Sequence, residues 1–327
     1  MRDYDLAFLF LYKKIVYLRC MIAINGLEIG VGHFPDGTQM LLDLPVDSIM
    51  AVASGKWGSH KIEVEWEYEN DEELVTLYYL VSHLRELVNA NETQFVLYLH
   101  YIPNARMDRV KSRTEVFTLK FFCNLINSMN FDKVFVLDPH SNVSEALLNN
   151  VVNKSPEPFI KYALDDVEGV FIDGGKQYGG TTVIYFPDAG AMKRYGGLSV
   201  FGDREFIYGS KDRDWKTGVI KGIKILNRDG ERITDEHYLD GKTVLMIDDI
   251  ISYGGTMAYS ADALKALGAS AIYIYATHTE NSILNKEKGT LLKRLDSGVV
   301  DELFTTSSIY RGKHDRITVI SKYFNGR

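Results

Sequence analysis

The sequence predicts an α/β protein with mostly parallel sheets, and three observations carry this prediction. A strand pattern rich in apolar residues runs from Thr243 to Ile247 and ends in two adjacent acids. Apolar residues three and four positions apart then predict a helix from Met257 to Ala269. Residues 271–278 form the next apolar strand pattern. Strand, helix and strand in this order make a βαβ unit, which is the building block of a parallel sheet.

The first half of the chain shows the same alternation. Strand patterns over residues 95–101 and 133–137 flank an amphipathic helix near residues 114–129, and another helix is predicted at about residues 72–88. At 327 residues the chain is long enough for two domains of ordinary size. The prolines of segment Asn153–Phe159 indicate a change of domain. We therefore expect domains at residues 21–155 and 156–327.

The two ends of the chain leave alternatives open. Residues 1–20 are expected to be either an extension or a leader that precedes an alternative start at Met21. Their apolar run, Leu6–Tyr12, is too short to span a bilayer, and acids stand where a signal peptide needs positive charge. The last strand is expected at Arg316–Ile320, and it could return to the N-terminal domain.

Composition limits the classes of partner. The net charge of −7 argues against nucleic acid or an anionic membrane as the main partner, because phosphate backbones demand basic surfaces. Phosphate groups must instead be bound by local lysines, arginines, backbone amides and metal. The only cysteines are Cys20 and Cys123, so a disulfide scaffold is not expected and a reducing cytoplasm fits.

The acids after the strand at residues 243–247 predict a ligand site. Asp248 and Asp249 are followed by Gly254, Gly255 and Thr256, where a helix capped by the threonine is expected to begin. Backbone amides and a helix N-terminus bind phosphate, while adjacent carboxylates hold sugar hydroxyls or a metal. A solvated loop is the alternative for this fragment alone. Its place inside a βαβ unit favours a site for a phosphorylated sugar.

This segment resembles the phosphoribosyl-diphosphate (PRPP) loop that type I phosphoribosyltransferases share with PRPP synthetases. Five other stretches resemble synthetase motifs and occur in family order: His33–Thr38, Tyr101–Arg109, Val136–Ser141, Phe186–Arg194 and Lys211–Arg213. Each is weak alone, but together they identify a likeness to the ribose-phosphate pyrophosphokinase (PRPP synthetase) family. The resemblance implies two type I phosphoribosyltransferase-like domains, with nucleotide loops in the first and the acceptor loop in the second.

The resemblance also implies a reaction. PRPP synthetases transfer the β,γ-diphosphoryl group of MgATP to the anomeric hydroxyl of ribose 5-phosphate and release AMP. ATP and a ribose-phosphate acceptor are therefore the expected partners, and Mg²⁺ is the expected cofactor. By the same resemblance the chain is expected to be a homo-oligomer, either a dimer or a hexamer, and its cysteine usage predicts a cytoplasmic location.

Family positions assign roles to individual residues. The ATP-binding residues would be Phe34, Asp36, Arg106, Asp108, Arg109 and His140. His140 and Asp188 would hold the metal, although the histidine could donate to a phosphate oxygen instead. Lys211 and Arg213 would be catalytic, clamping the transferring group from a flexible loop. Each assignment has an ordinary alternative. Phe34 could be a core residue, and the charged residues from Arg106 to Arg109 could form surface ion pairs. Lys211 and Arg213 could be solvated charges in a loop.

The acceptor loop departs from the family pattern. Asp248 and Asp249 would hold the ribose 2- and 3-hydroxyls, and the phosphate would lie against the loop made of Ser252, Tyr253, Gly254, Gly255 and Thr256. In the family, however, an acid normally stands at position 252 and a small hydroxylic residue at position 253. Thr38 and Met107 also replace the usual acid and glutamine of the nucleotide loops.

These departures keep other functions open. Tyr253 could contact a group attached to the 5-phosphate, so ADP-ribose is an alternative acceptor, with ADP-ribose pyrophosphate as the product and NAD salvage as the role. A catalytically silent, regulatory relative is a second alternative. A type I phosphoribosyltransferase is disfavoured, because it should lack the motifs around Phe34 and Arg106.

Overall fold

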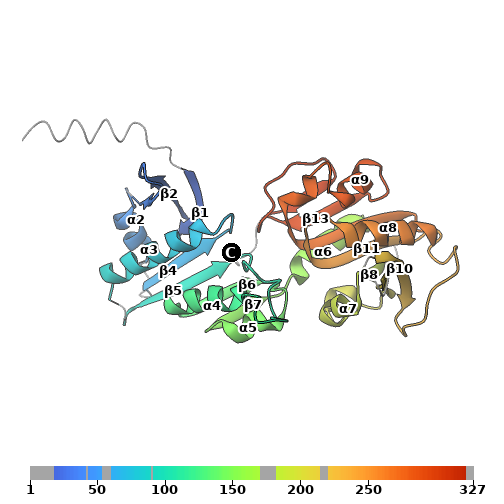
Figure 1. Cartoon of the computed structure of the whole chain (residues 1–327), viewed down its shortest axis with the longest axis horizontal. Coiled ribbons are helices and arrows are strands. Elements are labelled where there is room, and N and C mark those ends of the chain that lie inside the picture. Colours follow the sequence, from blue (N-terminus) through green and yellow to red (C-terminus); the bar gives the residue numbers. More distant parts are fainter. Residues whose placement is uncertain are drawn as a thin grey trace, which may run out of the picture. The chain divides into compact units, whose positions relative to one another are not determined.

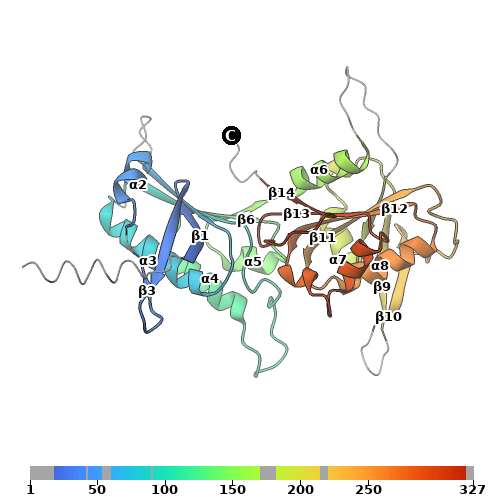
Figure 2. The same cartoon turned by 90° about the horizontal axis from the view of Figure 1, so that it is seen from above.

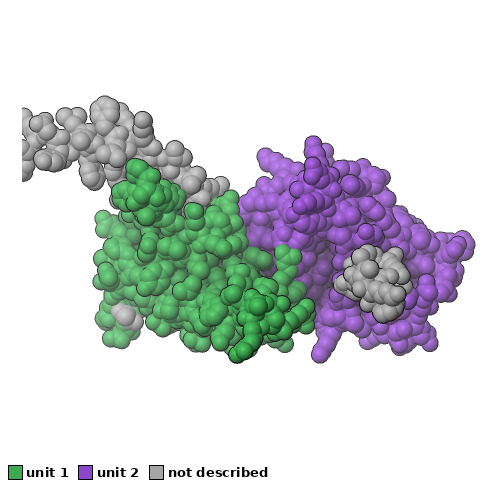
Figure 3. All heavy atoms as spheres, in the orientation of Figure 1, with its two compact units in different colours: residues 1–154 green, residues 155–327 purple. Residues whose placement is uncertain are grey.

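The computed structural model describes residues 18–41, 43–53, 60–89, 91–169, 182–213 and 220–321. The chain divides into two compact units, Met1–Lys154 and Ser155–Arg327, which are coloured separately in Figure 3. Each unit contains a seven-stranded sheet of its own. Most of the predicted N-terminal leader, residues 1–17, lies outside the described residues. Strand β1 (Leu18–Ile24) begins three residues before Met21.

The sheet of unit 1 has the strand order β3-β2-β1-β4-β5-β6-β7 (Figure 1). Strands β4 to β7 are parallel, whereas β1 pairs antiparallel with both β2 and β4, and β3 pairs antiparallel with β2. After β1, the strands are β2 (Leu27–His33), β3 (Gln39–Met40), β4 (His60–Trp66), β5 (Thr93–Leu99), β6 (Lys133–Leu137) and β7 (Val151–Lys154). The helices are α2 (Val46–Ala53), α3 (Glu72–Leu87), α4 (Thr118–Ser128) and α5 (Asn142–Leu147).

Side-chain alternation builds the core of unit 1. Ile62, Val64 and Trp66 on β4 are fully buried, and the polar residues between them face the other side of the sheet. Helices α3 and α4 each add a buried apolar stripe to the same core, with the spacing that the sequence predicts. Helix α4 begins at Thr118 rather than near residue 114, so a longer loop follows β5 than we expected.

A buried carboxylate ties β1 and β4 to α3. Glu73 is 5% exposed and accepts hydrogen bonds from the backbone amides of Met21 (3.1 Å) and Glu69 (2.8 Å) and from Trp66 Nε1 (3.0 Å). Replacing Glu73 by Gln keeps the shape but turns one acceptor oxygen into a donor that faces other donors. We expect unfolding free energy to fall by about 2 kcal/mol. Denaturant unfolding of the variant measures this, and an unchanged midpoint would contradict the assigned bonds.

The sheet of unit 2 has the order β10-β9-β8-β11-β12-β13-β14. All neighbouring strands are parallel except the hairpin of β9 and β10. The strands are β8 (Thr182–Phe186), β9 (Phe206–Arg213), β10 (Ile220–Asn227), β11 (Thr243–Ile251), β12 (Ala271–Thr279), β13 (Glu302–Thr306) and β14 (Ile317–Ile320). The helices are α6 (Glu157–Val167), α7 (Ala189–Tyr195), α8 (Gly255–Ala266) and α9 (Thr290–Asp296), with short 3₁₀ helices η1 (Ser199–Phe201) and η2 (Asn281–Leu284).

Helices cover both faces of this sheet, and Figure 2 shows α6 and α8 on opposite sides. The face toward α8 buries Val183, Tyr185 and Met246, and the Tyr185 hydroxyl donates to Ser260 Oγ of that helix at 2.6 Å. The α/β class with mostly parallel sheets is thereby confirmed. The last strand does not return to unit 1. It pairs with β13, because the apolar residues of β14 continue the same parallel sheet.

Candidate functional site

Two adjacent carboxylates lie near the carboxyl end of the central strand of unit 2. Asp248 and Asp249 lie in the last part of β11, and consecutive strand residues point to opposite faces of the sheet. Asp249 is only 6% exposed. Its amide donates to Asp248 Oδ1 at 3.0 Å. Burial, followed by the neighbouring Asp249 carboxylate, raises the pKa of Asp248 well above its ordinary value. The two acids therefore have different environments.

Two basic side chains lie at this edge of the sheet, one beside Asp249 and one beside a third acid, Asp188. Arg194, in the last turn of α7, places Nη1 3.5 Å from Asp249 Oδ2. Lys211, on β9, places Nζ 3.9 Å from Asp188 Oδ2, which lies just after β8. Asp188 also begins α7, because its Oδ1 accepts a hydrogen bond from the amide of Ala191 at 3.0 Å. The carboxyl ends of β8, β9 and β11 thus gather three acids and two cations.

A glycine brings Lys211 into this group. A side chain at Gly209 would overlap the Tyr185 hydroxyl and crowd the carbonyl of Pro187 at 2.9 Å. Without that side chain, β9 passes close to the turn between β8 and α7, and Lys211 follows two residues later on the same face. The other predicted catalytic residue, Arg213, is the last residue of β9, but its side chain lies outside the described part of the chain.

The loop after β11 forms the entrance to α8. Gly254 has a φ of +75° and occupies the cap position of the helix, which begins at Gly255. We expected Thr256 to cap the helix. It lies instead in the first turn, because the left-handed backbone at Gly254 starts the helix earlier.

Helix α9 holds the loop between β11 and α8 in place through two backbone hydrogen bonds. The carbonyl of Tyr253 accepts hydrogen bonds from the amides of Thr290 (3.0 Å) and Leu291 (3.2 Å). The Tyr253 side chain is not packed away, since the residue is 41% exposed. The loop therefore presents a fixed backbone to a ligand and leaves an aromatic ring at its surface.

The predicted nucleotide residues all lie in unit 1, and two of them share the turn between β2 and β3. Phe34 is 49% exposed, so it is not the core phenylalanine of the ordinary alternative. Asp36 Oδ1 accepts hydrogen bonds from the hydroxyl (2.7 Å) and amide (2.9 Å) of Thr38, which lower the pKa of this exposed carboxyl. Thr38 replaces the usual acid of the family and instead shapes the turn.

Three other nucleotide candidates follow β5 on an open loop. Arg106 and Arg109 are exposed and Asp108 is half-buried. Asp108 Oδ1 lies 3.9 Å from Arg109 Nε, which is a loose surface pair. The turn there is shaped by Asn104, whose φ is +62°.

The remaining nucleotide candidate follows β6. His140 is half-buried and comes two residues after Asp138, which is 3% exposed and has a φ of +42°. Such backbone is uncommon for a residue other than glycine. The structure thus places His140 three residues after the end of β6.

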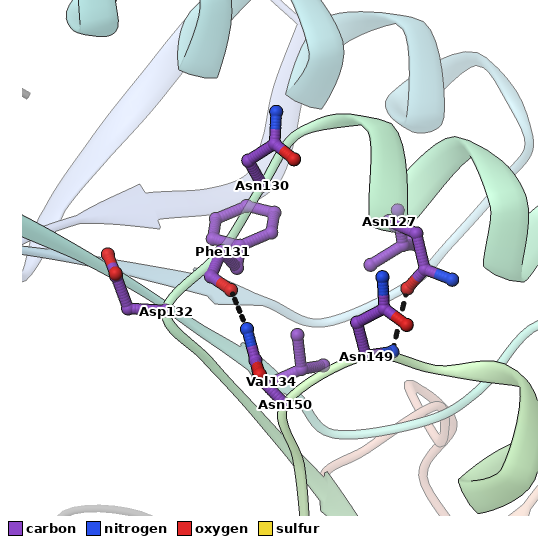
Figure 4. Close-up of a pocket in the computed structure, with 8 residues that line it drawn as sticks. Asn127, Asn130, Phe131, Asp132, Val134, Asn149 and Asn150 are labelled. Atoms are coloured by element: carbon purple, nitrogen blue, oxygen red, sulfur yellow. Dashed lines mark hydrogen bonds between the residues drawn. The ribbon is translucent and has the colours of Figure 1, made fainter.

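Unit 1 also has a polar cavity of about 120 Å³ at the amino ends of β6 and β7 (Figure 4). Its asparagines hold the surrounding chain together. Asn127 Oδ1 accepts from the Asn149 amide at 2.8 Å, and Asn150 Nδ2 donates to the Phe131 carbonyl at 2.9 Å. These hydrogen bonds give the asparagines a structural role. The cavity lies at the amino ends of the strands, whereas the candidate site residues of unit 1 follow the carboxyl ends.

Arg194 is the functional candidate to which sequence reasoning gave no role. It stands in the Phe186–Arg194 motif, but only the packing of α7 against β11 places it beside Asp249. Within the described residues, no cluster of three His, Cys, Asp or Glu side chains is placed to hold a metal ion. In the same part of the chain, no helix combines the length and apolar character needed to cross a membrane.

Residues 198–302 match the phosphoribosyl transferase domain family. The ribose-phosphate pyrophosphokinase of Sulfurisphaera tokodaii is 29% identical over 256 residues, which cover 76% of each chain. That of Thermococcus kodakarensis is 27% identical over 291 residues, 86% of each chain. In fold, the chain is similar to the crystal structure of phosphoribosylpyrophosphate synthetase from Mycobacterium smegmatis. The TM-score is 0.63 at 18% identity, over 89% of this chain and 85% of the other.

Proposed function

Since this chain belongs to the ribose-phosphate pyrophosphokinase family, we propose that it transfers the β,γ-diphosphoryl group of MgATP to the anomeric hydroxyl of ribose 5-phosphate. The products are PRPP and AMP. One observation carries the proposal: Lys211, Asp188 and the Asp248–Asp249 pair lie together at the carboxyl ends of β8, β9 and β11. Open α/β sheets bind their ligands at this edge.

The acceptor is held by its sugar and its phosphate. Asp248 and Asp249 accept hydrogen bonds from the ribose 2- and 3-hydroxyls, which are donors that match carboxylate oxygens. The 5-phosphate lies against the loop from Ser252 to Thr256, where backbone amides at the start of the 12-residue helix α8 face it. Contacts at both ends of the sugar leave the anomeric hydroxyl at a fixed place for attack.

The residues proposed to bind the donor ATP all lie in unit 1. Phe34 packs on the adenine, and Asp36 bonds the base or the ribose. The phosphates are bound by Arg106, with Asp108 and Arg109 in support, and by His140. During transfer, negative charge grows on the non-bridging oxygens of the diphosphoryl group. Lys211 and Arg213 stabilise this charge, which is the main work of an enzyme that transfers phosphoryl groups.

Mg²⁺ is the cofactor that this chemistry requires, and Asp188 suits it. The ion commonly binds one or two carboxylates and otherwise uses water and substrate phosphates, so a cage of three protein ligands is not needed. Asp188 Oδ2 is available, because the side chain is 51% exposed and Lys211 lies 3.9 Å away. When bound, Mg²⁺ neutralises phosphate charge. His140 fits less well as a ligand and would serve as a donor to phosphate.

A second acceptor is favoured by Tyr253. Tyr253 is 41% exposed and lies within the phosphate loop (Ser252–Thr256), where α9 holds its backbone carbonyl. A ring in that place can stack on a group carried by the 5-phosphate. We propose ADP-ribose as the alternative acceptor. Its product would be ADP-ribose pyrophosphate, which fits a role in NAD salvage.

Direct assays separate these acceptors. Purified protein is supplied with MgATP and either ribose 5-phosphate or ADP-ribose, and AMP is measured. We expect AMP with ribose 5-phosphate, and Tyr253→Thr should lower KM for that acceptor, because threonine restores the small side chain. AMP with ADP-ribose alone would overturn the first choice, and Tyr253→Thr should then raise KM for ADP-ribose at least 10-fold. AMP with neither acceptor would instead support the silent, regulatory alternative.

The expected assembly and location also stay proposals. We propose a homo-oligomer, dimer or hexamer, that acts in the cytoplasm. The family supports the first part, and the small number of cysteines is compatible with the second. Light scattering of the purified chain measures its mass in solution, and a monomer at assay concentration would contradict the proposed assembly.

A further inference from the structure

Arg194 lies beside the acceptor carboxylates but outside the group of residues expected to touch substrate. We infer that Arg194 is a positioning residue, which holds the Asp249 side chain in the orientation that receives the acceptor's ribose. This inference rests on the proposed function, because it needs Asp249 to bind the sugar. Under this inference α7 orients an acceptor-binding carboxylate, whereas the phosphate loop and the basic residues of β9 bind phosphate groups.

The contacts of Arg194 fix both partners. Its Nη1 lies 3.5 Å from Asp249 Oδ2, and the side chains are 25% and 9% exposed. The guanidinium carbon also lies 5.2 Å from the centre of the Tyr195 ring, and that tyrosine is 2% exposed. The arginine is therefore held between a buried ring and a buried acid. A cation in such a place restricts the rotamer of the carboxylate.

A carboxylate can bind a sugar hydroxyl in addition to the arginine. At 3.5 Å the pair is longer than a strong charge-assisted hydrogen bond, which measures about 2.7–2.9 Å. A carboxylate has about four acceptor positions. Sugar hydroxyls can therefore donate to the same carboxylate that Arg194 contacts. Arg194 thus acts on the acceptor through Asp249.

Helix α7 connects this contact to the rest of the site. Asp188 caps the first turn through the amide of Ala191 (3.0 Å), and Arg194 stands in the last turn of the same helix. The helix packs against β8, β9 and β11. A rigid element therefore sets the distance between Asp188 and Asp249, the residues assigned to the donor metal and to the acceptor sugar.

The test compares charge and length at position 194. Arg194→Gln should raise KM for the acceptor at least 10-fold, while kcat and KM for ATP stay within about 3-fold. Arg194→Lys should restore most of the acceptor KM, since it returns the charge. Lys193→Gln is the matched control: this exposed neighbour in the same turn should leave all constants unchanged. Melting temperatures show whether each variant is folded. If Arg194→Gln is unfolded, the acceptor KM of Arg194→Lys is the measurement that tests the inference.

A double variant distinguishes positioning from a merely structural role. In an Asp249→Asn background, Arg194→Gln should change acceptor KM less than 2-fold, because its effect passes through Asp249. Equal effects in both backgrounds would overturn the inference, as would a loss of kcat with an unchanged acceptor KM. Calorimetric titration with ribose 5-phosphate and with ADP-ribose separates the failures. If the wild-type chain binds neither compound, the proposed function fails; if it binds one and Arg194→Gln binds it equally, only the role of Arg194 fails.

Discussion

Replacing Lys211 by Ala is expected to lower kcat at least about 1,000-fold and to leave the melting temperature nearly unchanged. Cations and donors aimed at a transferring phosphoryl group contribute roughly 10³-fold or more. Lys211 lies 3.9 Å from Asp188 and is only partly buried, so its removal deletes a charge at the site without opening a core cavity. Initial rates of AMP formation, at saturating ATP and acceptor, measure the effect.

Lys224 provides a matched control on the same hairpin. It pairs with Ser210 across the two strands, whereas Lys211 pairs with Ile223, so the two lysines project from opposite faces. Lys224→Ala should keep kcat within about 3-fold of the wild type. Equal losses in both variants would mean that the hairpin needs its overall positive charge rather than Lys211 in particular. An active Lys211→Ala variant would remove this residue from the mechanism.

Local patterns were sufficient to predict the α/β class and the acids at the end of β11. An apolar strand followed at once by Asp248 and Asp249 leaves these side chains at a sheet edge, and a βαβ unit determines which edge. The spacing of apolar residues likewise predicted α3 and α8, since one helix face must be buried. Such features depend on neighbours within a few residues, which a single sequence displays.

Features that depend on distant packing could not be predicted in this way. The contact of Arg194 with Asp249 joins residues 55 positions apart through the docking of α7. The bonds of Thr290 and Leu291 to the carbonyl of Tyr253 join the phosphate loop to a helix that follows it 37 positions later. The residues just before Leu18, where β1 begins, contain no turn signal. Pairing with β2 and β4, rather than local composition, sets that boundary.

Gly254→Ala is expected to remove about 3 kcal/mol of unfolding free energy and to weaken acceptor binding at least 10-fold. The backbone at Gly254 has a φ of +75°, which costs a residue with a side chain about 1–2 kcal/mol. An added methyl group would also overlap the Leu291 side chain, and overpacking costs about 1–3 kcal/mol. Relief of either strain moves the loop that carries Tyr253, and with it the backbone amides proposed to bind the 5-phosphate.

Gly255→Ala is the control for Gly254→Ala, because it also reduces backbone flexibility but introduces no strain. A methyl group at Gly255 would meet Thr290 Oγ1 at 3.8 Å, an ordinary contact, and its backbone is helical. Gly255→Ala should therefore leave the unfolding free energy unchanged or raise it by up to about 1 kcal/mol. Denaturant unfolding of both variants makes the comparison. If Gly254→Ala proved as stable as Gly255→Ala, the contact between the phosphate loop and α9 could not be what holds Tyr253 in place. The exposed ring would then lose its value as an indicator of the acceptor.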